Sequence, residues 1–229
     1  MPGMGERSPA EIDLRELYGS LLAEHGPQGW WWPAQTPFEM MAGAVLVQNT
    51  RWQNVEMSIA RLRAQGLLHA EGLLTVPEEK LRELIRSSGF MRAKAAALLA
   101  LARWAEERGA AVPRLSDGQL RAELLALRGI GPETADVIGL YAYARPAFVP
   151  DAYARRLLEA AGFAVPRGYE AARRALAPAV AAAGFGVEEL TELHGLIVEE
   201  GKQRSRARVR TRAISAAPPC AGPIRPSPG

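Results

Sequence analysis

The chain has 229 residues, 48% of them hydrophobic, and a net charge of +3, which suits a globular protein with a buried core. Cys220 is the only cysteine, so neither an internal disulfide nor a cage of several cysteines around a metal can form. No segment approaches a membrane span and the beginning of the sequence has no apolar signal core, so a cytoplasmic protein is expected. The histidines, His25, His69 and His194, are too scattered in sequence to indicate a zinc site.

Charge is distributed unevenly along the chain. Seven basic and no acidic residues follow Gly201, so the first 200 residues carry 21 basic against 25 acidic side chains, a net charge of −4. Six of the basic residues alternate through KQRSRARVRTR, from Lys202 to Arg212. This run is compatible both with a solvated tail and with an arm that attracts phosphates. From Ala216 the Pro/Gly/Ala-rich sequence is expected to be disordered.

Capping and stop signals divide the sequence into helices, and no convincing strand pattern of period two is found in the core. The first expected helix begins at the capping box SPAE (Ser8–Glu11) and ends at Gly26, and the second begins at TPFE (Thr36–Glu39). A third begins at Thr50 and ends at Gly66, and a fourth starts at Pro77. A long helix, MRAKAAALLALARWAEERG, ends at Gly109, and the next begins at a capping box of Ser116 and Gln119. Further helices after Asp151 read AYARRLLEAAG, GYEAARRALAPAVAAAG and VEELTELHGLIVEEG, the last ending at Gly201. An all-α fold follows.

A tight glycine turn, LRGIG at residues 127–131, separates two of these helices. Gly129 and Gly131 would permit backbone angles closed to other residues and leave their amides bare, while Ile130 would enter the core. The helix from Pro132 would then point its N-terminus outward, where exposed amides bind a phosphate without sequence preference. The pattern fits a helix–hairpin–helix that binds the DNA backbone, and it equally fits an ordinary helix-turn-helix corner with a glycine cap.

The segment LRGIGPETADVI, followed by FVPDAYARRL, resembles the helix–hairpin–helix DNA glycosylases of the endonuclease III superfamily. FEMMAGAVLVQNT and IRSSGFMRAKA extend the resemblance upstream in the family's order, and together the motifs cover roughly residues 38–201. The resemblance implies that Asp151 is the catalytic aspartate. It also implies that Gln48 enters the gap left by a flipped base and that Phe90 is the wedge that intercalates.

Two departures from the family pattern bear on chemistry. Where strand-cutting members carry a lysine that forms a Schiff base, this chain has Glu133, so a water near Asp151 would be the nucleophile and no lyase activity is expected. Many relatives also hold an iron–sulfur cluster with four cysteines. Those positions correspond to Ser205, Arg212, Ser215 and Ala221, so neither the cluster nor another cofactor is expected.

An aromatic stretch, GWWWP, precedes the second predicted helix, and Trp52 follows that helix. The tryptophans would form either a hydrophobic strap between two lobes or a stacking cage, in which a cation over an aromatic face gains roughly 0.5–2 kcal/mol. Together with the glutamate of GIGPETAD, the stretch resembles the 3-methyladenine DNA glycosylase III type. That resemblance implies that Trp31 and Trp52 sandwich an alkylated base, with Trp32 and Pro33 as neighbours in the pocket.

The resemblance implies a two-lobed fold without a metal cluster. Residues 29–145 would form a six-helix barrel lobe with the hairpin, residues 1–28 and 146–205 a discontinuous second lobe, and residues 206–229 the basic and then Pro/Gly-rich tail.

The expected function is that of a monomeric, monofunctional DNA glycosylase of base excision repair, acting on double-stranded DNA at the bacterial nucleoid. It would hydrolyse the N-glycosidic bond of a flipped alkylated purine such as 3-methyladenine. A glycosylase for oxidised pyrimidines or mismatches remains an alternative, although Glu133 argues against its strand-cutting form. A non-catalytic module that binds DNA through the hairpin is the other alternative.

Overall fold

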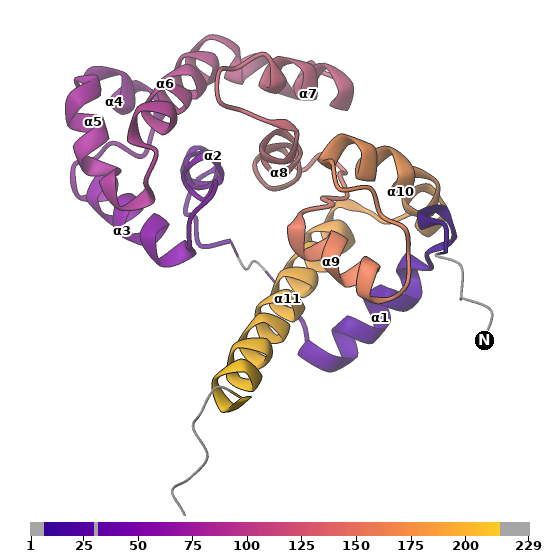
Figure 1. The fold of residues 1–229 in the computed structure, drawn as a ribbon. Helices are drawn as coiled ribbons and strands as arrows, with labels where there is room; N and C mark the ends of the chain where they lie inside the picture. The colour runs from indigo at the N-terminus through magenta and orange to yellow at the C-terminus, as the bar shows by residue number, and fades with distance from the viewer. Residues whose placement is uncertain (1–6, 30–31, 216–229) are drawn as a thin grey trace, which may run out of the picture.

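Helices form the regular structure of residues 7–29 and 32–215, which are the residues that the computed structural model describes, with side chains as far as Ala207. In chain order they are η1 (Pro9–Glu11), α1 (Leu14–His25), α2 (Pro37–Leu46), α3 (Trp52–Ala64), α4 (Ala70–Thr75), α5 (Glu78–Leu84), η2 (Arg86–Ser88), α6 (Met91–Arg108), η3 (Gly109–Arg114), α7 (Asp117–Leu125), α8 (Pro132–Tyr143), α9 (Ala152–Ala160), α10 (Tyr169–Ala183) and α11 (Val187–Ser215) (Figure 1). The expected all-α fold is confirmed.

Side-chain caps explain several of the helix starts. The hydroxyl of Thr36 accepts a hydrogen bond from the Glu39 amide at 3.1 Å, and Ser116 and Gln119 form the reciprocal capping box at the start of α7. The expected start at Ser8 is wrong for α1, because the capping box there closes only the turn η1 and α1 begins at the Asp13 cap. Thr50 does not cap α3 either, since its hydroxyl accepts from the Asn54 side chain instead.

Helix α8 lies between two groups of helices (Figure 1). It packs against α2 and α7 on one side and against α10 and α11 on the other, while α1 contacts α10 and α11. The chain therefore returns its first helix to the group formed by its last ones, which supports the proposed discontinuous lobe. A connected core of buried side chains, with Leu46, Leu98 and Ile138 among the most enclosed, runs through both groups. None of the described helices combines the length and the apolarity that a membrane crossing requires.

The C-terminal helix is longer than the sequence signals predict. Helix α11 passes through Gly201 and continues to Ser215, so the expected stop at Gly201 and the expected boundary between residues 205 and 206 both fall inside a helix. A Cβ atom at position 201 would overlap the ring of Tyr153 on α9. Glycine at this position therefore lets two helices approach closely instead of ending one of them. The predicted disorder from Ala216 onward lies outside the described residues.

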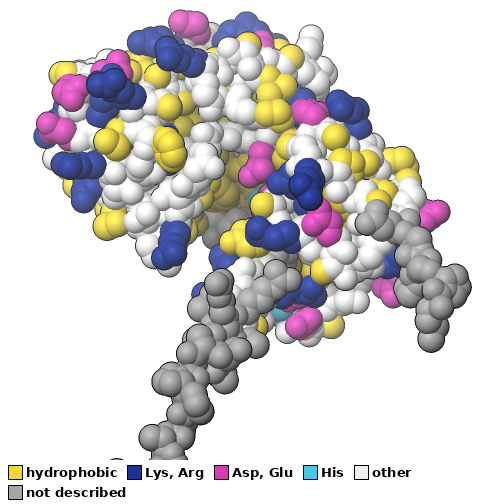
Figure 2. Space-filling model, in the orientation of Figure 1, with side chains coloured by type: hydrophobic (Ala, Val, Ile, Leu, Met, Phe, Trp, Pro, Cys, Tyr) yellow, Lys and Arg dark blue, Asp and Glu magenta, His cyan; other side chains and the backbone are white. Residues whose placement is uncertain are grey.

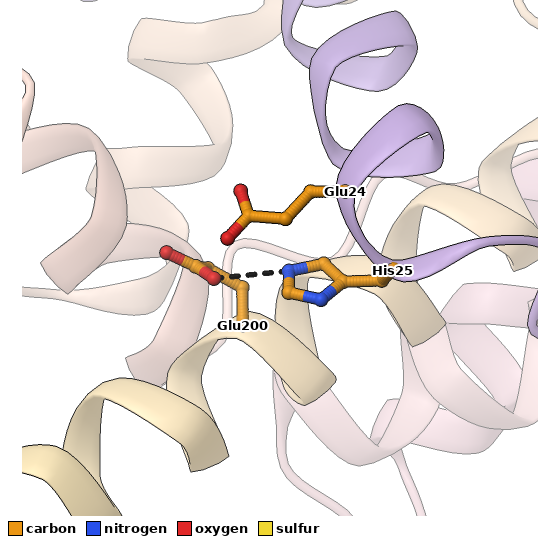
Figure 3. A group of neighbouring side chains, drawn as sticks. All are labelled: Glu24, His25 and Glu200. Atoms are coloured by element: carbon orange, nitrogen blue, oxygen red, sulfur yellow. Dashed lines mark hydrogen bonds and ion pairs between the residues drawn. The ribbon is translucent and has the colours of Figure 1, made fainter.

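A buried clamp joins α11 to α1 (Figure 3). The His25 Nε2 atom lies 2.9 Å from a Glu200 carboxylate oxygen, and both side chains are nearly fully buried. Glu24 points to the same place, and the three side chains bring possible metal-ligand atoms within 4.8 Å of one another. Because Glu200 already pairs with both His25 and Arg204, we interpret the group as a polar tie between helices.

Candidate active site

The predicted hairpin is present between α7 and α8. Gly129 adopts φ 86°, in the left-handed region that favours glycine, and a Cβ there would come within 2.7 Å of Ala97 on α6. Ile130 is buried, and its amide donates to the Leu127 carbonyl at 3.1 Å. The interpretation of Gly131 as conformationally special is wrong, because its φ of −88° and ψ of 175° describe ordinary extended backbone.

Neither backbone angles nor close packing within the described residues requires glycine at position 131. It is the N-cap residue of α8 and makes no side-chain cap, so the first-turn amides of that helix stay available to another acceptor. A Cβ at Gly131 would meet no atom within 4 Å. A helix N-terminus open in this way suits a phosphate group.

Asp151 is the N-cap residue of α9 and is buried. Its Oδ1 atom accepts a hydrogen bond from the Ala154 amide at 2.7 Å. Burial raises the pKa of Asp151 to about 6, against the opposing effect of first-turn amides and of Arg156 and Arg155. The carboxylate is thus held in a fixed orientation by one oxygen, and its ionised form is stabilised less than in water.

The sequence interpretation missed two further side chains: His194, which faces Asp151, and Tyr141, which contacts His194. The His194 Nε2 atom lies 4.0 Å from Asp151 Oδ2, and His194 Nδ1 lies 2.8 Å from the Tyr141 hydroxyl. Burial lowers the pKa of His194 to about 4, so the imidazole is neutral at physiological pH. Histidine and tyrosine inside apolar helical runs look like ordinary core residues, and no local motif marks this pair.

Trp32 lies next to Tyr141, and Trp52 lies next to Trp32. Trp32 is buried with its ring 5.5 Å from that of Tyr141 and 5.6 Å from that of Trp52, in an edge-on contact with the latter. Trp52 itself is half-buried, and its Nε1 donates to Glu56 at 3.0 Å. A continuous series of contacts therefore links Trp52, through Trp32, Tyr141 and His194, to the carboxylate.

The segment before Trp32 is anchored from α11. Glu192 accepts hydrogen bonds from the amides of Gln28 and Gly29, the latter at 2.9 Å. Pro33, on the other side, is exposed. Trp31, the residue expected to stack on the base, lies outside the described residues. The role of Glu192 was also missed, because a glutamate in a helix with many charges carries no signal of a long-range contact.

Glu133 occupies the first turn of α8 and retains contact with solvent. The pKa of Glu133 is raised, mainly because the surrounding protein removes part of its hydration and secondly because Asp151 carries a negative charge nearby. The positive charge of Arg155 opposes the rise. Glu133 and Asp151 therefore share one electrostatic environment. No amine occupies the side-chain position of Glu133.

The two residues expected to probe DNA lie on separate loops. Phe90 is 67% exposed, and its φ of 48° places a non-glycine residue in the left-handed region. Gln48 is half-buried, and its amide donates to the Gly129 carbonyl at 3.2 Å and to the Thr134 hydroxyl at 2.9 Å. In this structure Gln48 thus contacts the hairpin, so its entry into a DNA gap would require release of these hydrogen bonds.

One face of the molecule is hollowed. Figure 2 shows a hollow between the helices of the first group and α9 and α10, with Lys and Arg side chains on both sides of it. A separate cavity of about 370 Å³ lies between α7, α8 and α10. Arg121 and Arg173 pair there with the buried Asp136, at 2.6 Å and 3.4 Å. Neither Asp151 nor a tryptophan lines that cavity, so we assign it a structural role.

Comparison with known proteins identifies the class of protein. The family model of the HhH-GPD superfamily base excision DNA repair proteins matches residues 42–181. A protein of Methanocaldococcus jannaschii named as a DNA repair glycosylase is 42% identical over 154 residues, which are 65% of this chain and 70% of the relative. The endonuclease III of Thermotoga maritima is 30% identical over 141 residues, 61% of this chain and 63% of that enzyme.

Solved structures give the same assignment. The H. pylori 3-methyladenine DNA glycosylase bound to 1,N6-ethenoadenine superposes with a TM-score of 0.71 at 27% identity, over 86% of this chain and 99% of that one. An endonuclease III–DNA complex matches in fold, with a TM-score of 0.66 at 22% identity over 81% of this chain and 82% of that one. The chain belongs to the HhH-GPD superfamily and is a DNA glycosylase of that superfamily. The resemblance noted in the sequence is confirmed.

Proposed function

We propose that this DNA glycosylase is monofunctional and removes alkylated purines, 3-methyladenine among them, from double-stranded DNA. The observation that carries the proposal is the contact series from Trp52 and Trp32, through Tyr141 and His194, to the buried Asp151, which supports a site that combines aromatic rings with a carboxylate. The likeness to the H. pylori enzyme over nearly all of that enzyme's length supports the same substrate class.

The chemistry of the lesion suits a carboxylate that works without a general acid. A purine methylated on a ring nitrogen is cationic, so it leaves as a neutral base when the N-glycosidic bond breaks and the bonding electrons move to the base. The deoxyribose then carries positive charge, which the ionised Asp151 stabilises. A water molecule forms the new bond to the sugar carbon, and Asp151 accepts the proton that the water loses.

The aromatic residues supply recognition of charge. A cationic ring over an indole face gains roughly 0.5–2 kcal/mol, whereas an undamaged neutral purine lacks this contribution. Trp52 is half-buried at the first turn of α3 and is the described residue that we assign to this contact. The resemblance assigns Trp31 to the opposite face of the base, with Trp32 and Pro33 beside it.

The remaining parts of the site serve DNA binding. Gly129, Ile130 and Gly131 present the first-turn amides of α8 to a phosphate, and the hollow between the two groups of helices accommodates the duplex. Gln48 and Phe90 occupy the positions of the gap-filling and wedge residues. Each of these elements occurs within one chain, so we propose that a monomer acts on DNA at the bacterial nucleoid.

The second half of the proposal is that the enzyme leaves the strand intact. Strand cleavage by a lyase step needs an amine that attacks the sugar carbon to form an imine. Glu133 offers a carboxylate at the position of that amine, and a carboxylate cannot form an imine.

A panel of labelled duplexes tests the proposal. Each duplex carries one 1,N6-ethenoadenine, 3-methyladenine, thymine glycol or mismatched thymine, and products are resolved before and after alkali. We expect alkali-dependent cleavage at 3-methyladenine, slower cleavage at 1,N6-ethenoadenine because this adduct is not cationic, and none at thymine glycol or the mismatch. Excision confined to thymine glycol or the mismatch would contradict the assigned substrate class, and binding without excision of any lesion would favour a non-catalytic module.

A further inference from the structure

The two loops that probe DNA share a buried polar base. The gap loop, Val47–Arg51, carries Gln48 and follows α2. The wedge loop, Arg86–Phe90, carries Phe90 and precedes α6. They are almost forty positions apart in the sequence, yet the same side chain contacts the backbone at the base of both.

That side chain is Lys94, in the first turn of α6. It is only 3% exposed, and its Nζ atom donates to the Leu46 carbonyl at 2.8 Å and to the Ser88 carbonyl at 2.6 Å. Each carbonyl lies two residues before the probing residue of its loop, Gln48 or Phe90. Both hydrogen-bond partners are backbone carbonyls, and burial lowers the pKa of Lys94 to about 8. Burial of an ammonium costs free energy, and the hydrogen bonds to the two carbonyls offset part of that cost.

A hydroxyl cluster joins the same two loops beside Lys94. Ser58, fully buried on α3, lies 2.7 Å from the Ser87 hydroxyl and 2.8 Å from the Ser88 hydroxyl. Ser87 donates to the Asn54 carbonyl at 2.9 Å, and the Asn54 side chain donates to the Thr50 hydroxyl in the gap loop at 2.9 Å. Buried networks of this kind hold a single arrangement because each member constrains the next.

Backbone strain is found in the same two loops. Asn49 has φ 54° and Phe90 has φ 48°, both in the left-handed region, which non-glycine residues seldom adopt. Such conformations persist where the surroundings over-determine them, and they concentrate at functional sites. Here each strained residue is the probing residue itself or its direct neighbour.

We propose that Lys94 is a positioning residue that fixes the gap loop and the wedge loop relative to each other, so that Phe90 and Gln48 act on the duplex as one rigid element. The inference rests on the proposed function, since it assumes that the two loops open DNA around a damaged base. Lys94 does not touch the reacting atoms. Its contribution falls on extrusion of the nucleotide, and cleavage of an already extruded base does not depend on it.

The test compares Lys94→Met with Lys80→Met. Methionine keeps an unbranched apolar chain but cannot donate, and Lys80 is an exposed lysine of α5 that pairs with Glu83 at 3.0 Å and controls for loss of one positive charge. Single-turnover excision is measured on an alkylated adenine in a normal duplex and on the same lesion in an unpaired bulge, where extrusion is less costly.

For Lys94→Met we expect a loss of about 10- to 100-fold on the paired lesion, since flipping a paired base costs a few kcal/mol, and a loss under about 3-fold on the bulged one. Lys80→Met should match the wild type on both substrates. Equal losses on both substrates, or no loss on the paired lesion, would overturn the proposal.

Two further measurements keep the outcome decisive. If Lys94→Met does not fold, Ser58→Ala takes its place, because it removes the adjoining hydroxyl and should show the same paired-lesion defect. Fluorescence of a 2-aminopurine beside an abasic-site analogue reports unstacking without excision, so it tests Lys94 even if the wild type releases no alkylated base. If folded Lys94→Met produces the same rise in 2-aminopurine fluorescence as the wild type, the role assigned to Lys94 is wrong, whether or not the enzyme excises alkylated purines.

Discussion

His194 faces Asp151 across 4.0 Å, from Nε2 to Oδ2, and lies 2.8 Å from the Tyr141 hydroxyl through its other ring nitrogen. The same hydroxyl lies 3.3 Å from the Thr191 carbonyl, so it donates its one proton either to that oxygen or to Nδ1. Donation to Nδ1 leaves the proton of the neutral imidazole on Nε2, the nitrogen nearer the carboxylate. Tyr141 also contacts Trp32, so the aromatic pocket and the carboxylate belong to one packed unit.

Removal of the imidazole should change the ionisation of Asp151. In His194→Leu an apolar side chain replaces a polar ring 4.0 Å from the ionised carboxylate, so we expect the apparent pKa of single-turnover excision to rise above the value of about 6 and the rate at pH 7 to fall. Glu133, Arg155 and Arg156 also act on this titration and stay unchanged.

Tyr141→Phe is the matched variant, since it keeps the ring against Trp32 and removes only the hydroxyl. It should shift the pH profile in the same direction by a smaller amount. A lower melting temperature with an unchanged pH profile in both variants would mean that the pair is structural.

Asp151→Asn should stabilise the fold while it abolishes excision. Asparagine still caps α9, whereas the wild-type carboxylate is ionised at neutral pH in a site that raises its pKa to about 6 from the ordinary value of 3.8. Above pH 6 the buried charge therefore disfavours the native wild type by roughly 1–3 kcal/mol.

This difference should vanish in acid. As the pH falls through 6 toward 3.8, the native carboxylate binds its proton before the unfolded one does, and the disadvantage of the wild type disappears. Titration of His194 occurs in both proteins and cancels in the comparison. Urea unfolding of both proteins at pH 7.5 and pH 4 measures the effect, and a variant less stable than the wild type at pH 7.5 would refute the assigned burial.

Borohydride should fail to trap the enzyme on DNA. An imine requires an accessible amine, and position 133 carries a carboxylate while the Lys94 amine is buried against two carbonyls. We expect product strands with intact abasic sites on denaturing gels. A trapped complex would show that another amine, such as that of Lys202, enters the site.

Trp52→Ala should weaken binding of the cationic base by roughly 1–3 kcal/mol, the range for loss of a base–aromatic stack, and change binding of undamaged duplex less. Trp31→Ala is expected to do the same. Trp104→Ala provides a control, because Trp104 is buried on α6 and donates to Glu123 at 2.8 Å far along the chain from the pocket. Its loss should lower stability and leave the preference for alkylated duplex intact. If Trp52→Ala keeps the preference for alkylated duplex, Trp52 has a structural role and does not contact the base.

The basic end of α11 should add binding without selectivity. Replacement of Lys202 and Arg206 with glutamine removes two positive charges from the helix and leaves the pair of Arg204 with Glu200 in place. Affinities for damaged and undamaged duplex should fall together, and the slope of log affinity against log salt should flatten by about one unit for each phosphate that the helix no longer binds. If the slope stays the same, this stretch is solvated and binds no phosphate.

Local signals predicted most of the helices but missed α4, and contacts between distant residues decided the rest. Thr36, Ser116 and the turn at Gly129 act on neighbours within a few positions, so their patterns identified helix starts and the hairpin correctly. The prediction of a stop at Gly201 is wrong because the reason for its glycine, the ring of Tyr153, is on another helix.

The candidate site also contains residues that a local motif predicts and residues that only the folded structure shows. The prediction of Asp151 as the catalytic residue rests on a proline and an aspartate that follow the hairpin in the order of a known motif, and the structure shows this carboxylate buried. His194 and Tyr141 reach it from α11 and α8, and their spacing in the sequence carries no trace of the 2.8 Å contact between them. Lys94 likewise looked like one charge in a helical pattern, since its two carbonyl partners become neighbours only in the folded chain.

The most direct test of the proposed function is release of free bases from methylated DNA. Wild type and Asp151→Asn are incubated with DNA treated with dimethyl sulfate, and the released bases are separated by chromatography, with binding to an alkylated duplex measured in parallel. We expect that the wild type releases 3-methyladenine and leaves unbroken strands with abasic sites, and that Asp151→Asn binds the duplex but releases almost none. Undiminished release by Asp151→Asn, or no release of a methylated purine by the wild type, would contradict the proposed function.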